Sequence, residues 1–313
     1  MKRKTLLFSL SAAAGAAFCA WLAGTYRRHR YTHIQRLIAG SRIAQTPSGP
    51  LEYGLAGEGP PVLVLHGAAG GYDMGLLLTA VGFPFTWIAP SRPGYLRTPL
   101  ETGLTFEEQA DAFAALLDVL DIERLPVVGI SAGGPPALHF AMRHPDRCSA
   151  LALVSAVTAP IPPLPPFVAS LIRAASRSDF LTWLVIQLPY LPIPGGPGLR
   201  GQMQTSAERR ARFRALASTV FPFAPRFPGL QNDLRQMSRL QPFPFEAISV
   251  PTFVIHGGAD RLVPVRQGQH AAERIPDARF LPLPGGDHMA FVTQQKTSRP
   301  ALEAFLREHT AAN

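Results

Sequence analysis

Short apolar runs that alternate with helical patterns constrain the fold more than any other feature of this sequence. The six runs are Val62–Leu65, Thr86–Ala89, Val127–Ile130, Ala150–Val154, Thr252–Ile255 and Ala278–Leu283. Continuous apolar runs of this length are typical of strands buried on both faces, and helices between such strands are typical of parallel connections. The sequence therefore predicts an α/β fold in which helices cover both faces of a mostly parallel sheet.

The regions around these runs predict the helices and an entry hairpin. The clearest helix is expected over Thr105–Leu120, which opens with a Thr-x-x-Glu capping box and carries its apolar residues on one stripe. Further helices are expected over Ala137–Arg143, after the third run, and over Arg299–Glu308, at the end of the fold. Before the first run, Ser41–Ala56 indicates a hairpin with its turn at Pro47-Ser48-Gly49-Pro50.

The alternation breaks over Val157–Glu246. This stretch holds 14 of the 32 prolines, ten arginines and four acidic residues. Helical patterns recur within it at Phe167–Arg177, Leu181–Leu188 and Thr205–Thr219, the last with its own capping box. So long a connection without structure would be unusual inside a compact domain, so we expect a helical insertion.

A serine stands at the turn between a predicted strand and a predicted helix, in Gly129-Ile130-Ser131-Ala132-Gly133. The pattern G-x-S-x-G in this context predicts a sharp turn that exposes a nucleophilic hydroxyl. Side chains at the two glycine positions would collide with neighbouring elements, and the helix N-terminus favours a developing anion. The pattern alone often occurs by chance, but its place between strand and helix makes Ser131 the candidate nucleophile.

A second glycine-rich loop, His66–Gly71, follows the first apolar run. Its small residues let the backbone approach a substrate oxygen, so the amides of Ala68 and Ala132 are the candidate oxyanion hole, while His66 is expected to hold the loop. A phosphate-binding loop is excluded because the motif lysine is missing and Lys296 is the only lysine after position 4. The candidate substrate contacts are Gly67, Ala69 and Tyr95.

Asp260 and His288 each follow one of the last two runs. The order Ser131, Asp260, His288 is that of the hydrolase triads built on α/β sheets. Parallel strands bring their carboxyl ends to one edge of a sheet, so these three side chains are expected to meet. Each residue alone has an ordinary structural explanation, and Asp287 is a rival acid, but its position beside His288 is expected to point its carboxylate away.

The basic character of the chain belongs to its N-terminus. The formal net charge is +9, yet residues 1–51 hold eight Lys or Arg and no acid, which leaves 22 basic and 21 acidic residues in the remainder. A nearly neutral folded part argues against a nucleic-acid partner. Two cysteines are too few for a disulfide scaffold or a cysteine-based zinc site, and no nucleotide or metal motif is present, so no cofactor is expected.

Residues 5–26 carry no charge and lie between two basic clusters, Lys2-Arg3-Lys4 and Arg27-Arg28-His29-Arg30. As a helix they would extend about 33 Å, which is about the thickness of a bilayer core. We therefore expect residues 1–40 to be a single-pass membrane anchor with a basic linker, followed by a domain over 41–313. A cleaved signal peptide, and hence secretion, is the alternative. The side of the membrane is not predicted because both flanks are basic.

Taken together, these motifs resemble the α/β-hydrolase fold superfamily over about residues 42–310. The matching segments are His66-Gly67, Ser91-Arg92-Pro93-Gly94-Tyr95, the turn around Ser131, His144-Pro145-Asp146-Arg147, His256-Gly257-Gly258-Ala259-Asp260 and Gly286-Asp287-His288. The resemblance implies a sheet of about eight strands with a helical cap between the sixth and seventh, which would be residues 157–246. One departure is Leu96, where members often carry glycine.

The residue at the turn distinguishes activities within this family. Its epoxide hydrolases and haloalkane dehalogenases use an aspartate, whereas Ser131 implies an acyl-enzyme intermediate. We therefore expect a serine hydrolase that acts on a carboxylic ester of a small or lipophilic substrate. A C–C bond hydrolase, a lactonase or a perhydrolase on the same triad stays open, as does a non-catalytic ligand-binding member. The sequence does not predict the oligomeric state.

Overall fold

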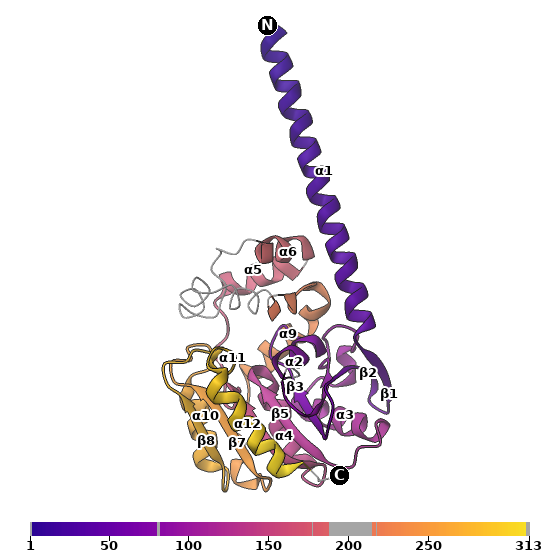
Figure 1. The fold of residues 1–313 in the computed structure, drawn as a ribbon. Coiled ribbons are helices and arrows are strands. Elements are labelled where there is room, and N and C mark those ends of the chain that lie inside the picture. The colour runs from indigo at the N-terminus through magenta and orange to yellow at the C-terminus, as the bar shows by residue number, and fades with distance from the viewer. Residues whose placement is uncertain (1, 80–81, 177, 188–214, 217, 311–313) are drawn as a thin grey trace.

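The computed structural model describes residues 2–79, 82–176, 178–187, 215–216 and 218–310 (Figure 1). The helix predicted over Thr205–Thr219 therefore lies largely outside the described residues. Within them, the elements follow one another from an N-terminal helix, through a sheet interrupted by helices, to a closing helix.

Eight strands form one sheet in the order β1-β2-β4-β3-β5-β6-β7-β8. They are β1 (Arg42–Thr46), β2 (Gly49–Ala56), β3 (Pro61–Leu65), β4 (Thr86–Pro90), β5 (Leu125–Ile130), β6 (Cys148–Val154), β7 (Thr252–Gly257) and β8 (Arg279–Leu283). The pairs from β4 to β8 are parallel, and only β1–β2 and β2–β4 are antiparallel among the described pairs. The predicted mostly parallel sheet of about eight strands is confirmed.

The predicted entry hairpin is formed by β1 and β2. Thr46 pairs with Gly49, so Pro47 and Ser48 make a two-residue turn. Gly49 has a φ of +121°, a backbone conformation that residues with a side chain rarely adopt. The prediction of a turn at this Pro-Ser-Gly-Pro segment is therefore correct.

Helices cover both faces of the sheet. One buried cluster joins the sheet to α3 (Phe106–Val119), α4 (Gly134–Arg143) and α10 (Val265–Arg274). A second cluster, on the other face, joins it to α2 (Tyr72–Thr79), α11 (Ala290–Thr293) and α12 (Gln295–His309). Burial of apolar area in these two clusters is the main stabilising term for such a layered domain.

The capping box predicted for the first of these helices is present in α3. The hydroxyl of Thr105 accepts from the Glu108 backbone N–H at 3.1 Å, and the Glu108 carboxylate accepts from the Thr105 backbone N–H at 3.0 Å. The helix α4 begins earlier than its predicted start at Ala137, because the two prolines that precede Ala137 fit the first turn of a helix.

A helical cap lies between β6 and β7, as the resemblance implied. Its described helices are α5 (Pro166–Ser176), α6 (Asp179–Gln187) and α9 (Phe227–Met237), with short 3₁₀ turns at Ala224–Arg226 and Phe245–Ala247. In Figure 1, α5 and α6 lie above the α/β core, and α9 lies between them and the core.

The N-terminal helix α1 (Lys2–Ala39) runs for 38 residues and extends well beyond the rest of the molecule (Figure 1). Its C-terminal part packs against the fold. Leu37 is buried, Arg30 Nε lies 3.0 Å from Asp179 Oδ2 of the cap, and the ring of Tyr26 meets Phe180 edge to face at 5.3 Å. The first helix and the cap are thus in direct contact.

The membrane segment predicted over residues 5–26 finds no support in this helix. Among the described residues, no helix combines the length and the apolar character that crossing a bilayer requires. The side chains of residues 2–12 lie outside the described part of the structure.

Candidate active site

The candidate nucleophile lies at the tight turn that joins the central strand β5 to α4. Ser131 has a φ of +52°, a strained conformation for a residue with a side chain. The flanking glycines are required by close packing. A Cβ at Gly129 would lie 2.7 Å from the Cβ of Ala137, and one at Gly133 would overlap the carbonyl oxygen of Leu65. The turn therefore holds Ser131 in one position at the end of β5.

The three candidate triad residues come together at the carboxyl ends of their strands. His288 Nε2 lies 3.0 Å from Ser131 Oγ, and His288 Nδ1 lies 2.8 Å from Asp260 Oδ2. Because an ionised carboxylate only accepts, Nδ1 carries the proton and Nε2 presents its lone pair to the serine hydroxyl. This is the arrangement that a general base next to a nucleophile needs.

Asp260 is buried and receives several hydrogen bonds. Its Oδ1 accepts from the backbone N–H groups of Leu262 and Val263, each at 2.9 Å, and its Oδ2 faces His288 and, at 3.4 Å, His256 Nε2. Burial alone would raise the pKa of this carboxyl, but the hydrogen bonds from the two histidines and from Val263 outweigh it and hold the pKa well below its ordinary value. Asp260 is therefore ionised at neutral pH.

The rival acid does not contact the imidazole ring. Asp287 Oδ1 accepts from the backbone N–H of Met289 at 2.9 Å, and Oδ2 is buried with no hydrogen-bond partner among the described residues. The carboxylate therefore caps its own turn, which agrees with the expectation that it points away from His288.

The glycine-rich loop after β3 lies directly beside the serine. A Cβ at Gly67 would be 3.2 Å from the Ser131 Cβ, so a side chain at this position would crowd the nucleophile. Ala68, the next residue, and Ala132, at the start of the turn that leads into α4, flank the serine from two elements. Backbone N–H groups at the start of a helix have no partner within the helix, and Ala132 lies at such a start.

His66 holds this loop, as the sequence predicted. Its Nδ1 lies 2.8 Å from the Gly67 carbonyl, which can only accept, so this nitrogen carries the proton. Its Nε2 then accepts from the Arg92 backbone N–H at 3.0 Å. Burial and the nearby Arg92 charge hold the pKa of His66 well below its ordinary value, so the ring is neutral.

Tyr95, which the sequence suggested as a substrate contact, is completely buried instead. Its hydroxyl donates to Asp233 Oδ2 at 2.6 Å. A fully buried hydroxyl that donates to a carboxylate inside the protein is not available to a substrate. Among the predicted contacts, Gly67 and Ala69 remain in the loop beside Ser131.

The three-dimensional fold matches known hydrolases. An α/β-hydrolase fold protein from Nakamurella multipartita superposes with a TM-score of 0.69 at 30% sequence identity, over 85% of this chain and 99% of that chain. The alpha/beta hydrolase fold model also matches residues 60–187. The chain belongs to the α/β-hydrolase fold superfamily.

Two curated relatives of this α/β hydrolase cover most of its length. An uncharacterized hydrolase, YcgS, from Bacillus subtilis is 28% identical over 267 residues, which is 79% of this chain and 91% of the relative. A putative carbamate hydrolase, RutD, from Pseudomonas savastanoi is 28% identical over 263 residues, which is 80% of this chain and 95% of the relative. The chain is thus an enzyme of the α/β-hydrolase fold.

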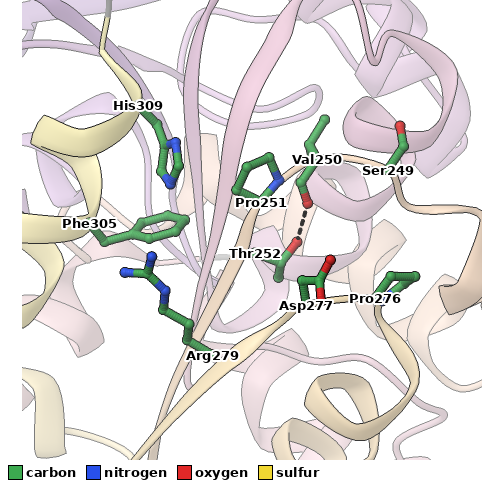
Figure 2. Close-up of a pocket in the computed structure, with 9 residues that line it drawn as sticks. All are labelled: Ser249, Val250, Pro251, Thr252, Pro276, Asp277, Arg279, Phe305 and His309. Carbon is green, nitrogen blue, oxygen red and sulfur yellow. Dashed lines mark hydrogen bonds between the residues drawn. The ribbon is translucent and has the colours of Figure 1, made fainter.

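A separate pocket of this hydrolase, of about 290 Å³, lies at the amino ends of β7 and β8 (Figure 2). Thr252 and Arg279 line it from the first residues of β7 and β8, and Phe305 and His309 line it from α12. In a parallel sheet the amino ends of the strands are one strand length away from the carboxyl ends, where Ser131 lies. The pocket is therefore not part of the candidate active site.

No metal centre is apparent in the described part of this hydrolase. No group of three His, Cys, Asp or Glu side chains is placed there to hold a metal ion. Two fully buried charged residues near the site, Arg92 and Asp233, were not among the site residues predicted from the sequence.

The low pKa of Asp260 predicts a pH-dependent contribution to stability. A carboxyl whose pKa is lower in the folded than in the unfolded protein stabilises the fold above the unfolded value, near 3.8, and loses this contribution as the pH falls below it. We expect Asp260→Asn to lower the free energy of unfolding by roughly 2 kcal/mol at neutral pH, the size of hydrogen bonds to a charged group. The loss should shrink toward pH 3.

Denaturant titrations of the wild type and the variant at several pH values measure this difference. Asp287→Asn is the matched control because it removes a neighbouring carboxylate that caps only its own turn, and it should change stability much less. If Asp260→Asn lowered the free energy of unfolding by the same amount at every pH, the conclusion that hydrogen bonds keep Asp260 ionised would be wrong.

Proposed function

We propose that this enzyme is a serine hydrolase that cleaves a carboxylic ester of a small or lipophilic substrate through an acyl-enzyme intermediate. The observation that carries the proposal is the position of His288, which bridges Ser131 Oγ at 3.0 Å and Asp260 Oδ2 at 2.8 Å. The two glycine-rich turns that flank the serine support it, because their backbone amides are available to a developing oxyanion.

In the first half of the reaction, Ser131 Oγ attacks the ester carbonyl carbon while His288 Nε2 takes the hydroxyl proton. The carbonyl oxygen becomes an oxyanion that the amides of Ala68 and Ala132 stabilise. Collapse of this intermediate breaks the ester C–O bond. His288 returns its proton to the alkoxide, so the alcohol leaves and the acyl group stays on Ser131.

In the second half, His288 accepts a proton from water, and the resulting hydroxide attacks the acyl carbon. The bond to Ser131 Oγ breaks, the oxygen regains its proton from His288, and the acid leaves. Asp260 keeps His288 in the tautomer with a proton on Nδ1 and stabilises the imidazolium that forms in each half. Its ionised state at neutral pH suits this role.

The surroundings of the serine support a lipophilic substrate. Ala132 belongs to a buried cluster with apolar side chains of the core and the cap, and Ala68 packs against the same cluster. The other members are Phe106, Val157, Met237 and Val263, with Ile161, Leu234 and Leu240 packed against them. An apolar cluster this close to the reacting atoms favours a lipophilic group on the substrate.

Carbamate hydrolysis is a second candidate, because the relative RutD is named a putative carbamate hydrolase. The same serine chemistry would apply, since a carbamate also presents an acyl carbonyl to the nucleophile. A substrate panel of carboxylic esters with graded acyl length, lactones, carbamates and C–C substrates distinguishes these reactions by their kcat/KM values.

A fluorophosphonate probe tests the nucleophile directly. We expect the probe to label the wild type, because it forms a covalent adduct with a serine that an adjacent base activates. Ser131→Ala should abolish labelling, and His288→Ala should lower both labelling and ester turnover by orders of magnitude. In-gel fluorescence and peptide mapping locate the adduct.

Ser155→Ala is the matched control for this experiment. Ser155 also follows a parallel strand, is buried and has a positive φ of 43°, but it has no place in the proposed mechanism. The variant should label as the wild type does. A folded wild type that is not labelled, or a label that persists in Ser131→Ala, would overturn the proposed function.

The location of the protein stays a prediction that rests on the sequence of residues 5–26 and on no observation in the fold. We expect the full chain to sediment with membranes and to require detergent for release, whereas a chain that lacks residues 1–25 should stay in the supernatant. A full chain found in the supernatant would contradict the anchor. An intact mass that lacks about 20–25 N-terminal residues would instead indicate a cleaved signal peptide.

A further inference from the structure

A buried ion pair joins the cap to the core next to the candidate oxyanion loop. Arg92, just after β4, and Asp233, in the cap helix α9, are both fully buried. The guanidinium donates from its two terminal nitrogens to the two carboxylate oxygens, and one of these nitrogens also donates to Gln109 Oε1 at 3.2 Å. A charged pair is costly to bury without hydrogen bonds, and four hydrogen bonds from the Arg92 guanidinium compensate this pair.

The same arginine holds His66 at two points. Its Nε donates to the His66 carbonyl at 3.0 Å, and its backbone N–H donates to His66 Nε2 at 3.0 Å. His66 in turn binds the Gly67 carbonyl, and Gly67 abuts Ser131. A continuous chain of contacts therefore leads from the cap carboxylate to the loop beside the nucleophile.

A second route starts from the same carboxylate. The Tyr95 hydroxyl donates to Asp233 Oδ2 at 2.6 Å, and Ala68 and Ala69 pack against the buried cluster that contains Tyr95. Its ring also packs edge to face on the His66 ring, with the centroids 4.8 Å apart. Ala69 has a φ of +58°, a strained conformation that persists only where the surroundings fix it. Asp233 thus reaches the loop around Ala68 by two routes, through hydrogen bonds to His66 and through the packing of Tyr95.

We infer that Asp233 is a positioning residue for catalysis, which acts through Arg92 and Tyr95 to fix the backbone of the oxyanion loop at Ala68. The inference rests on the proposed function, in which the Ala68 amide binds the oxyanion. Asp233 belongs to the cap, whereas the oxyanion loop belongs to the core, so the cap helps to fix the geometry of the active site. An amide held this way is preorganised for the transition state and adds little to ground-state binding.

The alternative is that Asp233 only fastens the cap. The structure offers a control for this, because a second bidentate pair joins cap and core nearby. Arg226 of the cap donates to both oxygens of Asp73 at 3.0 Å, and Asp73 stands in the first turn of α2, beyond the loop. Both pairs anchor the cap, but only the Asp233 carboxylate is linked through Arg92 and Tyr95 to His66 and Ala69.

The experiment compares Asp233→Asn and Tyr95→Phe with Asp73→Asn in the full-length enzyme. For each protein we would measure thermal stability, kcat and KM on one ester, and the inhibition constant of a trifluoromethyl ketone. Such a ketone adds to the serine as a tetrahedral oxyanion and reports on the oxyanion hole. Tyr95→Phe keeps the Arg92–Asp233 pair and removes only the hydrogen bond from the tyrosine hydroxyl to Asp233, so it serves if Asp233→Asn does not fold.

We expect Asp233→Asn and Tyr95→Phe to lower kcat by about tenfold or more, part of the hundredfold or greater effect of losing an oxyanion donor. Their KM should stay within about threefold of the wild type, and the ketone inhibition constant should rise in proportion to the loss in kcat. Asp73→Asn should lower the thermal midpoint but leave kcat and the inhibition constant nearly unchanged.

Two results would overturn the inference. One is a Tyr95→Phe variant with wild-type kcat and ketone affinity. The other is an Asp73→Asn variant whose kcat and ketone affinity fall as much as those of Asp233→Asn, since the carboxylate would then act only as a fastener of the cap. In both cases a wild type that turns over esters leaves the proposed function standing. A wild type that neither turns over esters nor binds the ketone would overturn the proposed function and this inference together.

Discussion

The turn from β5 into α4 is the constraint on which the rest of the site depends. The central strand must end, reverse into a helix and leave the Ser131 hydroxyl facing His288, all within a few residues. The strained φ of Ser131 persists because Gly129 and Gly133 let α4 and the end of β3 approach the turn closely. The other site residues are placed relative to this turn. The neighbouring parallel strands bring Asp260 and the loop that carries His288 to the same edge, as the topology of such sheets requires.

Several charged side chains near this turn are buried. Asp260 sits among hydrogen-bond donors that keep it ionised, and the Arg92–Asp233 pair lies without exposure between core and cap. In a low-dielectric interior such groups are costly unless each is fully paired, and fully paired groups hold their neighbours in a defined geometry. The buried ring of His66 is likewise neutral and has a hydrogen-bond partner at each nitrogen. The protein itself therefore sets the charge states and positions of these groups before any substrate binds.

Much of this arrangement could be predicted from sequence, because it follows from local patterns. Each apolar run became a strand, and the capping box at Thr105 opened a helix, since strand burial and helix capping depend on nearby residues. The grouping of Ser131, Asp260 and His288 followed from the G-x-S-x-G motif, the order of the three residues and their places after parallel strands. The role of Tyr95 could not be predicted in this way. Its hydroxyl binds Asp233, which is 138 residues away along the chain, and no local pattern encodes such a contact. The hydropathy of residues 5–26 likewise suggested a membrane segment that the described helices do not support.

The central claim is that Ser131 carries an acyl group during turnover. Rapid-quench mixing of the enzyme with an ester, followed by intact-mass measurement and peptide mapping, tests it most directly. The account predicts a transient mass increase equal to the acyl group, located on the peptide that contains Ser131 and absent in Ser131→Ala. The adduct should form before steady-state turnover and decay as the acid is released. Ester turnover that proceeds at wild-type rates in Ser131→Ala, or an acyl group found on another residue, would contradict the account.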